Sequence, residues 1–148
     1  MPSVSTCDTT ETRKSTETQR KPTKRIAHEE LNELTREVIG SAIEVHKALG
    51  PGFIERVYTK ALQMELRERQ VPFSTEVTIR LKYRGQQLGI HRLDFVVSEK
   101  LIVELKVVYE INRFHIAQIL SYLKASGLSL GLVLNFARGT LEIKRVAL

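Results

Sequence analysis

The chain contains almost no cysteine, no tryptophan and few prolines, and these shortages exclude several classes of protein. Of its 148 residues one is cysteine, four are proline and none is tryptophan. A single cysteine, Cys7, can form neither a disulfide framework nor a cluster of thiolate metal ligands. No apolar run approaches the ~20 residues of a membrane-spanning helix, and residues 1–28 lack the apolar core of a signal peptide. We therefore expect a cytoplasmic protein without structural zinc.

Positive charge is in excess along the chain, with 23 lysines and arginines against 17 acidic residues and a net charge of +6. Cationic side chains gain affinity for polyanions by releasing counterions from phosphates. A solvated surface of modest charge explains the same composition equally well. Charge alone therefore leaves nucleic acid as one candidate partner among others.

The first 28 residues differ in composition from the rest of the chain. They are rich in threonine, serine, glutamate, lysine and arginine and hold few apolar residues. Such a segment cannot bury enough apolar surface to offset the entropy of ordering. We predict a disordered basic tail over residues 1–28 and one folded domain over residues 29–148, which is long enough to bury a core.

Hydrophobic periodicity predicts eight elements in the folded domain. Apolar residues recur at three- and four-residue steps from Glu29 to Gly50 and from Phe53 to Gln70, as in amphipathic helices. Alternating and apolar runs predict strands within residues 76–97 and 100–110, a third helix over 113–126, and two closing strands within 128–136 and 140–148. The expected fold is α/β, of the α+β type, with a central mixed sheet of about five strands flanked by helices. The order is helix, helix, three strands, helix, two strands.

Three charged residues interrupt the two apolar runs of the stretch "LDFVVSEKLIVELK" at residues 93–106: Asp94, Glu104 and Lys106; Glu99 and Lys100 lie in the turn between the runs. Side chains alternate across a strand, so the faces of the two strands decide how a hairpin pairs. A turn centred on Glu99 pairs residues 93 with 105, 95 with 103 and 97 with 101. Apolar residues then face each other, and Asp94 lies directly opposite Glu104.

Facing carboxylates repel, because the Cβ atoms of opposed residues are only about 4.5–5.5 Å apart. A divalent cation such as Mg²⁺ or Mn²⁺ would compensate, since it takes hard oxygen ligands and is commonly bound by one or two carboxylates. Lys106 points to the same face and could orient water or stabilise a phosphoryl group. The alternative is a row of solvent-facing charges, but the strand is apolar on both faces, where unpaired charges are expensive.

These residues resemble the D-(x)n-E-x-K signature of the PD-(D/E)XK nuclease superfamily. More narrowly, the segments "EVHKALGPGFIERVYTKAL", "VELKVV" and "HIAQILSYLKASGLSLGLVLNF" are similar to the GxxExxY protein family. The naming motif of that family corresponds to Gly52, Glu55 and Tyr58. The resemblance covers about residues 30–148 and implies a restriction-endonuclease-like core.

The resemblance also implies a metal site and a catalytic lysine. Asp94 and Glu104 would bind Mg²⁺ or Mn²⁺, with the main-chain carbonyl of Leu105 as a further ligand. Lys106 would be the catalytic lysine. Glu55 matches the acidic residue that RecB-like members supply from an early helix, and it is a further candidate ligand.

Candidate contacts for nucleic acid surround this set. Gln118 and Tyr122 match a Gln-x-x-x-Tyr pattern of RecB-like nucleases, and residues four apart share a helix face. Arg92 could clamp a phosphate. His115 lies near Gln118 and could contact phosphate, although a surface histidine is an equal alternative. His46 either lines the site or packs in the core against the glycine-proline-glycine turn that follows the first helix.

We therefore predict a hydrolase, a metal-dependent phosphodiesterase that cleaves DNA, acting as a homodimer or within a larger repair or defence complex. One alternative is a catalytically silent nuclease fold that binds nucleic acid or serves as an adaptor subunit. The intact set of Asp94, Glu104 and Lys106 speaks against it, because a pure binder has no need to oppose two acids. Another alternative is RNA as the substrate, and a third is activity only inside an assembly.

Overall fold

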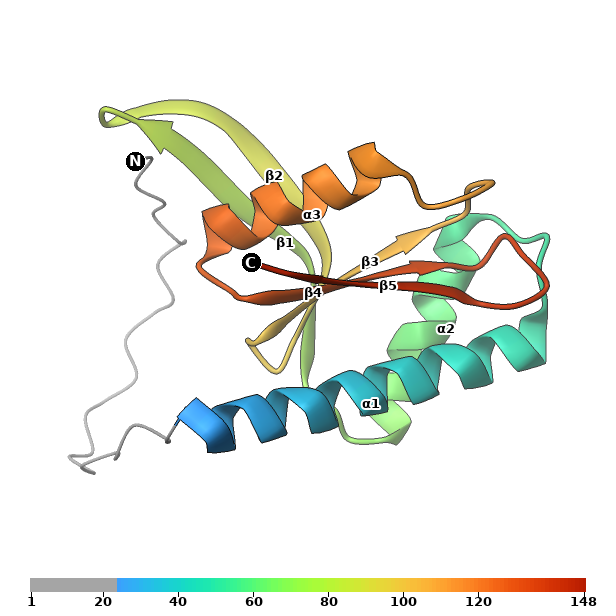
Figure 1. Ribbon diagram of the computed structural model, residues 1–148. Helices are drawn as coiled ribbons and strands as arrows, with labels where there is room; N and C mark the ends of the chain where they lie inside the picture. Colours follow the sequence, from blue (N-terminus) through green and yellow to red (C-terminus); the bar gives the residue numbers. More distant parts are fainter. Residues whose placement is uncertain (1–23) are drawn as a thin grey trace.

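The computed structural model describes residues 24–148, which form three helices and five strands (Figure 1). The predicted order of elements is confirmed. None of these three helices combines the length and the apolar composition that crossing a membrane requires. Cys7 and most of the predicted tail lie outside the described residues. The elements are α1 (Lys24–Leu49), α2 (Glu55–Glu68), β1 (Phe73–Tyr83), β2 (Gln86–Val97), β3 (Leu101–Lys106), α3 (Arg113–Ser126), β4 (Leu130–Asn135) and β5 (Glu142–Ala147).

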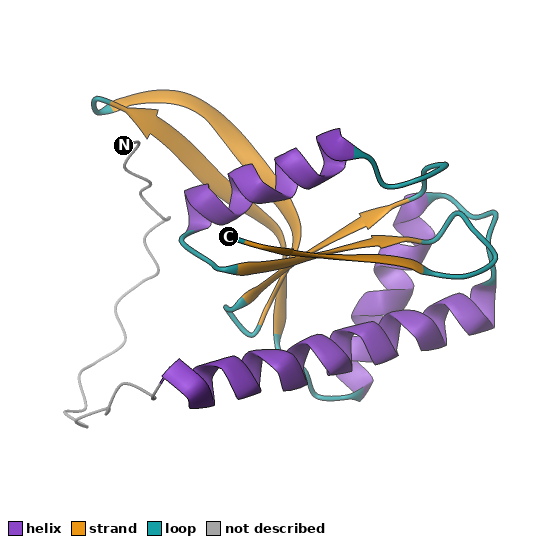
Figure 2. Ribbon diagram, viewed as in Figure 1, coloured by secondary structure: helices purple, strands orange, loops and turns teal. Residues whose placement is uncertain are grey.

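The five strands form one mixed sheet in the order β1-β2-β3-β4-β5. Neighbouring strands are antiparallel except β3 and β4, which are parallel. Parallel strands need a crossover connection, and the chain supplies it with α3. This helix lies on one face of the sheet, whereas α1 and α2 lie on the other (Figure 2).

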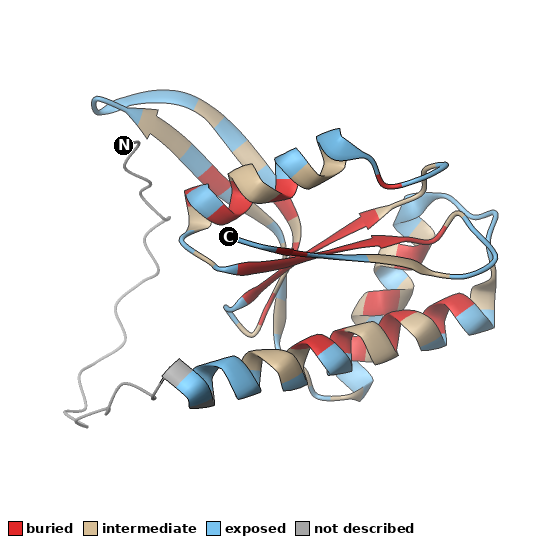
Figure 3. Ribbon diagram, in the orientation of Figure 1, coloured by how far each residue is buried: buried red, intermediate tan, exposed pale blue. Residues whose placement is uncertain are grey.

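Two apolar clusters, one on each face of the sheet, form the core (Figure 3). Phe95 and Leu105 belong to the cluster under α1 and α2, and Ile102 and Ile119 belong to the cluster under α3. The central strands β3 and β4 are buried almost throughout, which explains their continuous apolar sequence. A charged side chain in β3 therefore sits in an apolar setting.

Helix α1 includes residues from Lys24 on and so starts before Glu29, where the apolar periodicity placed its beginning. Arg25 forms an ion pair with Glu29 one turn later, at 3.3 Å. Pairs at this spacing stabilise an exposed helical turn by about 0.2–0.5 kcal/mol. Apolar content, which located the predicted boundary, does not register such charge pairs.

The β2–β3 hairpin pairs as predicted next to its turn. Val97 pairs with Leu101 and Phe95 with Val103, so the turn is centred where the matching of apolar faces placed it. The regular pairing ends at Phe95↔Val103. The two strands therefore separate at Asp94.

Beyond this point the predicted alternation is wrong, because β2 changes face at Asp94. Leu93 packs in the α3 cluster, whereas Leu105, its predicted partner, packs toward α1 and α2. In the neighbouring strand β1, Glu76 has a left-handed backbone with φ of 51°, and the register skips the position opposite Asp94. The pairing resumes in the same register at Val77↔Leu93, just beyond this position. Apolar residues on its two sides then point to opposite faces of the sheet.

Candidate active site

Two acidic side chains, Asp94 and Glu104, meet where β2 and β3 separate, and we call them the carboxylate pair. The main-chain N–H of Asp94 donates to Oε1 of Glu104 over 3.0 Å. The main-chain N–H of Leu105 donates to Oδ2 of Asp94, also over 3.0 Å. Each carboxylate thus takes the place of a main-chain acceptor from the opposite strand. The structure brings the two predicted acids together, and side-chain hydrogen bonds hold them there.

The surroundings of the carboxylate pair oppose a second negative charge. Glu104 is 4% exposed. Burial, followed by the charge of Asp94, raises the pKa of Glu104 to about 9. The main-chain hydrogen bond from Asp94 and the charge of Lys106 act in the lowering direction and offset only part of this rise. The protonated form of Glu104 is therefore favoured near neutral pH.

Lys106 follows Glu104 on the same face of β3, since side chains alternate along a strand. Its Nζ donates to Oε1 of Gln118 over 3.3 Å. Among the described residues no ion pair joins Lys106 to Asp94 or Glu104. A neutral amide on α3 therefore holds the lysine beside the two acids, which leaves the acids without a neutralising partner.

Tyr122 lies one turn after Gln118 on α3 and faces the carboxylate pair. Burial, followed by the charges of Glu104 and Asp94, raises the pKa of Tyr122 to about 12. The ring of His91 on β2 packs edge-on against the tyrosine, with 4.7 Å between ring centroids. The Tyr122 hydroxyl thus stays protonated and keeps a hydrogen to donate.

Glu55 reaches the site from the first turn of α2. Burial, followed by the charge of Asp94, raises its pKa, and the charge of Lys106 lowers it. These effects show that Glu55 shares an electrostatic environment with both residues. The turn before it includes Gly52, whose φ of 111° is a conformation that favours glycine. The Gly-x-x-Glu spacing thus combines a tight turn with an acid at the start of the next helix.

Tyr58 fixes the turn that places Glu55. Its hydroxyl donates to the main-chain carbonyl of Gly50 over 2.6 Å and accepts from the N–H of Phe53 over 3.3 Å. Its ring stacks on Phe136, with 4.6 Å between centroids. The tyrosine is fully buried. In the Gly52, Glu55, Tyr58 motif, Tyr58 therefore stabilises the turn that contains Gly52 and precedes Glu55.

A second polar cluster, which we call the loop anchor, consists of Asn135 and Glu142 and holds the loop after β3. Asn135 is buried on β4 beside Lys106. It accepts from the N–H of Val108 over 3.1 Å, and its Nδ2 donates to the Val108 carbonyl over 2.8 Å and to Oε1 of Glu142 over 3.0 Å. Glu142 also accepts from the N–H of Ile111 over 3.0 Å. The hydrogen bond from Asn135 is the largest cause that holds the pKa of Glu142 below its ordinary value.

Three predicted contact residues take different positions. The Nε2 atom of buried His46 lies 2.7 Å from the Arg138 carbonyl, so this histidine packs in the core, although against the β4–β5 loop and not against the predicted turn. His115 Nδ1 accepts from the N–H of Asn112 over 3.1 Å and completes the cap of α3. Arg92 is exposed on β2, two residues from the carboxylate pair.

The sequence did not predict the loop anchor or the contact between His91 and Tyr122. An amide that ends an apolar strand, as Asn135 ends β4, is a signal for a buried hydrogen-bonding role, because buried polar groups are almost always paired. His91 carries no such signal. Its face depends on the change of direction at Asp94, which the alternation pattern does not show.

The oxygen donors at this site fit a hard divalent cation. Within residues 24–148 no three histidine, cysteine, aspartate or glutamate side chains form a ready metal cage. Mg²⁺ does not need one, because it keeps several waters and is commonly held by one or two carboxylates. The N–H and C=O of one strand residue point to the same side, so the Leu105 carbonyl faces Asp94 as its N–H does. Asp94, Glu104 and this carbonyl form the fitting set.

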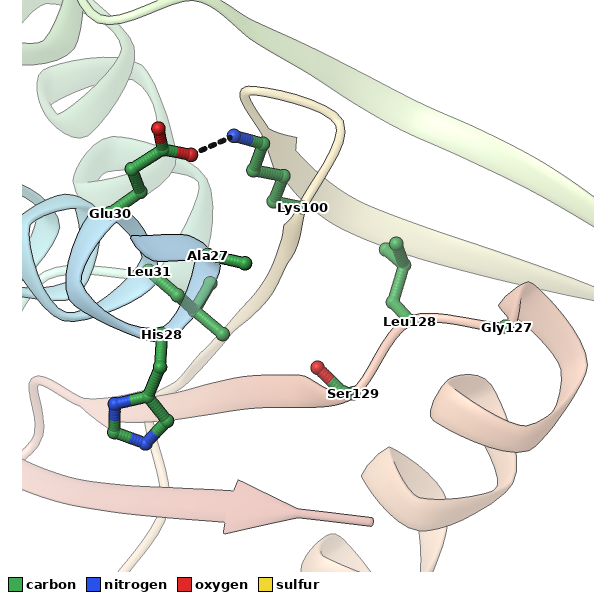
Figure 4. A pocket seen from close by; sticks show the side chains of 8 residues that line it. All are labelled: Ala27, His28, Glu30, Leu31, Lys100, Gly127, Leu128 and Ser129. Carbon is green, nitrogen blue, oxygen red and sulfur yellow. Dashed lines mark hydrogen bonds and ion pairs between the residues drawn. The ribbon is translucent and has the colours of Figure 1, made fainter. Parts of the chain in front are cut away.

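A cavity of about 400 Å³ lies at the other end of β3, between the start of α1, the β2–β3 turn and the loop before β4 (Figure 4). Glu30 and Lys100, which line it, form an ion pair at 3.2 Å. None of the candidate site residues lines this cavity. A six-residue strand spans roughly 17 Å, so the cavity is well separated from the carboxylate pair.

A mixed sheet that carries an aspartate and a Glu-x-Lys set on adjacent central strands is the arrangement that the sequence resemblance implied. Comparison with protein families agrees, because the family model of the PD-(D/E)XK nuclease superfamily matches residues 32–146. The chain belongs to the PD-(D/E)XK nuclease superfamily. A search of curated proteins found no match. The narrower resemblance to the GxxExxY family stays a prediction.

The solved structure of SSO0001 is similar in fold. The two structures align with a TM-score of 0.50 at 17% sequence identity, over 83% of this chain and 60% of that chain. The chain thus spans about 60% of the length of that protein. At this identity the likeness concerns the fold alone.

Proposed function

We propose that the protein is a metal-dependent phosphodiesterase that cleaves DNA. The supporting observation is the carboxylate pair itself, next to Lys106: the N–H of Asp94 donates to the Glu104 carboxyl, and the N–H of Leu105 donates to the Asp94 carboxylate. Like charges in a buried sheet destabilise the fold unless something neutralises them. A bound cation, together with a substrate phosphate, would explain why two acids lie side by side here, which packing alone does not explain.

Residues of the site have distinct roles in this proposal. Asp94, Glu104 and the Leu105 carbonyl hold Mg²⁺ or Mn²⁺. When bound, the metal stabilises charge on phosphoryl oxygens and lowers the pKa of water. Lys106, which Gln118 holds in place, orients the attacking water and stabilises the negative charge that develops on the phosphate.

Two further residues complete the site. Glu55 binds next to the metal or accepts a proton, and its raised pKa suits either role. The protonated Tyr122 hydroxyl donates a hydrogen bond toward the substrate. The turn held by Tyr58 also supports the narrower assignment to the GxxExxY family, because Gly52 and Tyr58 of the motif shape the turn that leads into Glu55.

The direct test is cleavage of labelled linear, nicked, single-stranded and branched DNA by the full-length protein. Reactions contain Mg²⁺, Mn²⁺ or EDTA, and the variants are Lys106→Ala and Lys100→Ala. Lys100 is an exposed lysine at the other end of β3 and serves as a matched control. We expect metal-dependent cleavage that Lys106→Ala slows about 10²–10³-fold and Lys100→Ala leaves unchanged.

Other outcomes would change the assignment. Absence of cleavage on every substrate, with equal DNA binding by the wild type and Lys106→Ala, would contradict the enzyme and favour the silent binding module or a subunit. Cleavage of RNA and not of DNA would keep the chemistry and replace the substrate. Cleavage that persists in EDTA would remove the metal from the proposal.

A further inference from the structure

The β1–β2 hairpin continues past the layered body of the molecule as a two-stranded ribbon (Figure 1). The two strands stay paired out to Tyr83↔Gln86. Near its base α3 covers one face, where Ile79 is buried. Toward the tip Leu88 and Tyr83 are exposed, and the ribbon is exposed along most of its outer length (Figure 3). We call residues 78–92 the arm.

The arm carries four cations and no acidic residue: Arg80, Lys82, Arg84 and Arg92. None of the four takes part in an ion pair among the described residues. Four basic residues elsewhere on the described surface form ion pairs: Arg25, Arg36, Arg69 and Lys100. The arm differs from the rest of the surface in having no acidic residue of its own. A cationic surface without counter-charges of its own attracts a polyanion.

The base of the arm adjoins the candidate active site. Arg92 precedes Asp94 by two residues, and its neighbour His91 packs on Tyr122. Side chains alternate along each strand. Since Ile79 and His91 turn toward α3, the next residues, Arg80 and Arg92, point to the opposite face, where both are exposed.

The arm is long enough to follow a nucleic acid beyond the reacting bond. From Arg92 to the turn at Gln86 the strand advances six residues, about 20 Å. Phosphates of one DNA strand recur every ~3.4 Å along the helix axis, so the arm spans about six base pairs. A two-stranded β-ribbon also fits the major groove, which is about 12 Å wide.

Building on the proposed nuclease function, we propose that the arm binds the phosphate backbone of a nucleic-acid duplex beside the bond that is cleaved. Its role is to position the duplex, and the chemistry remains with the carboxylate pair and Lys106. Apolar Leu88 and Ile90 are exposed among the cations. A second copy of the chain is a poor occupant, because two arms face to face would set four cations against four. A polyanion matches the charge.

The test compares two triple variants of the full-length protein that lose the same charge. The arm variant is Arg80→Gln, Lys82→Gln and Arg84→Gln. The control variant is Lys47→Gln, Lys124→Gln and Lys144→Gln, three exposed lysines outside the arm. Fluorescence anisotropy in EDTA measures binding of a labelled DNA duplex, an RNA duplex and a single DNA strand, with salt varied between ~50 and ~200 mM.

We expect the arm variant to bind both duplexes at least about tenfold more weakly, because each lost phosphate contact reduces the slope of log affinity against log salt by about 0.9. Three contacts would lower the slope by about 2.7, and the control variant should change it by less than about 1. With Mg²⁺ the arm variant should show a raised KM for duplex cleavage and an unchanged kcat. If the triple variant unfolds, the single variants Arg80→Gln and Arg84→Gln should each lower the slope by about 1.

Failure of the arm and failure of the nuclease give different results. A wild type that cleaves DNA, with an arm variant of unchanged salt slope and unchanged KM, would overturn the arm and leave the nuclease. Arm-dependent duplex binding by a wild type that never cleaves would support the arm and remove the nuclease. Equal losses for duplex and single strand would overturn the duplex assignment. If the wild type is a dimer, the arm variant is a monomer and both bind nucleic acid equally, the arm would instead be a contact surface for a second copy of the chain, and the proposal would be overturned.

Discussion

Two polar clusters lie side by side toward the ends of β3 and β4, each with one buried member, Glu104 or Asn135, and they combine their polar groups in opposite ways. In the loop anchor, the Asn135 amide donates to Glu142 and bonds both main-chain groups of Val108. In the carboxylate pair, Asp94 and Glu104 are both acceptors and carry like charge whenever both are ionised. Complementary groups hold a loop in place, whereas two adjacent acids are the arrangement that the proposed metal site requires.

The pKa values of two glutamates express the same difference. Hydrogen bonding holds the pKa of Glu142 below its ordinary value, and burial beside Asp94 raises that of Glu104 to about 9. The fold thus favours the charge on one glutamate and opposes it on the other. Exchanging or titrating these groups shows whether the first cluster is structural and the second functional.

The largest expected effect comes from exchanging one carboxylate for an amide in each cluster. Glu104→Gln should slow metal-dependent cleavage about 10²–10³-fold. Without metal its melting temperature should stay the same or rise, because the amide, like the protonated carboxyl of Glu104, places no second negative charge beside Asp94. Glu142→Gln should lower the melting temperature and leave the cleavage rate within about twofold. A lower melting temperature for Glu104→Gln than for the wild type in EDTA would show that Glu104 stabilises the fold, as Glu142 does, and would contradict the proposed difference between the two clusters.

Truncating the loop anchor should cost stability. Asn135→Ala leaves buried main-chain groups of Val108 without partners, and each such group costs about 1–3 kcal/mol. We expect urea unfolding to show a loss of about 2–4 kcal/mol. Ser41→Ala is the matched control, because this buried hydroxyl only bonds the Glu37 carbonyl of its own helix. A loss below about 1 kcal/mol for Asn135→Ala would show that the loop does not depend on the anchor.

Added Mg²⁺ should raise the stability of proteins with an intact carboxylate pair, whether or not the loop anchor is intact. Mg²⁺ at about 100 times its dissociation constant should stabilise the wild type by about 2.7 kcal/mol, seen as a rise in melting temperature. Asp94→Ala should show no rise, and Asn135→Ala should show one on its lower baseline. Equal Mg²⁺ effects on the wild type and Asp94→Ala would remove the proposed site.

The last expected effect is a pH dependence that belongs to Glu104. Because its pKa is raised in the folded protein, the folded state keeps a proton that the unfolded chain loses above about pH 4.5. Without metal, stability should therefore fall as pH rises from about 5 to about 9. Melting temperatures across this range should show the decline in the wild type and a flatter profile in Glu104→Gln. Parallel profiles would mean that Glu104 titrates normally.

Local periodicity was sufficient for the elements and for part of the site. The helices, strands and their order follow from apolar spacing, and the apolar match around the turn brought Asp94 to Glu104. Strand alternation placed Lys106 on the same face as Glu104. Each of these features depends on residues close together in sequence, so the pattern contains the needed information.

Features that depend on distant partners were not predictable in the same way. The change of face at Asp94 accompanies the left-handed backbone of Glu76 on a neighbouring strand, and nothing in an alternating sequence marks that residue. His46 binds a carbonyl 92 residues later in the chain. Asn135 reaches Val108 across 27 residues. Contacts of this kind depend on how distant parts of the chain pack together, which local periodicity does not show.

Because Asp94 and Glu104 each accept a main-chain N–H from the opposite strand, the sheet constrains both positions, and the proposed reaction would constrain them further. A variant library screened only for folded protein should retain residues with a side-chain oxygen at these positions, including asparagine and glutamine, and lose aliphatic ones. A library screened for cleavage should retain the acids alone. Comparing the residue types that survive in the two libraries would separate the requirements of the sheet from those of the proposed reaction.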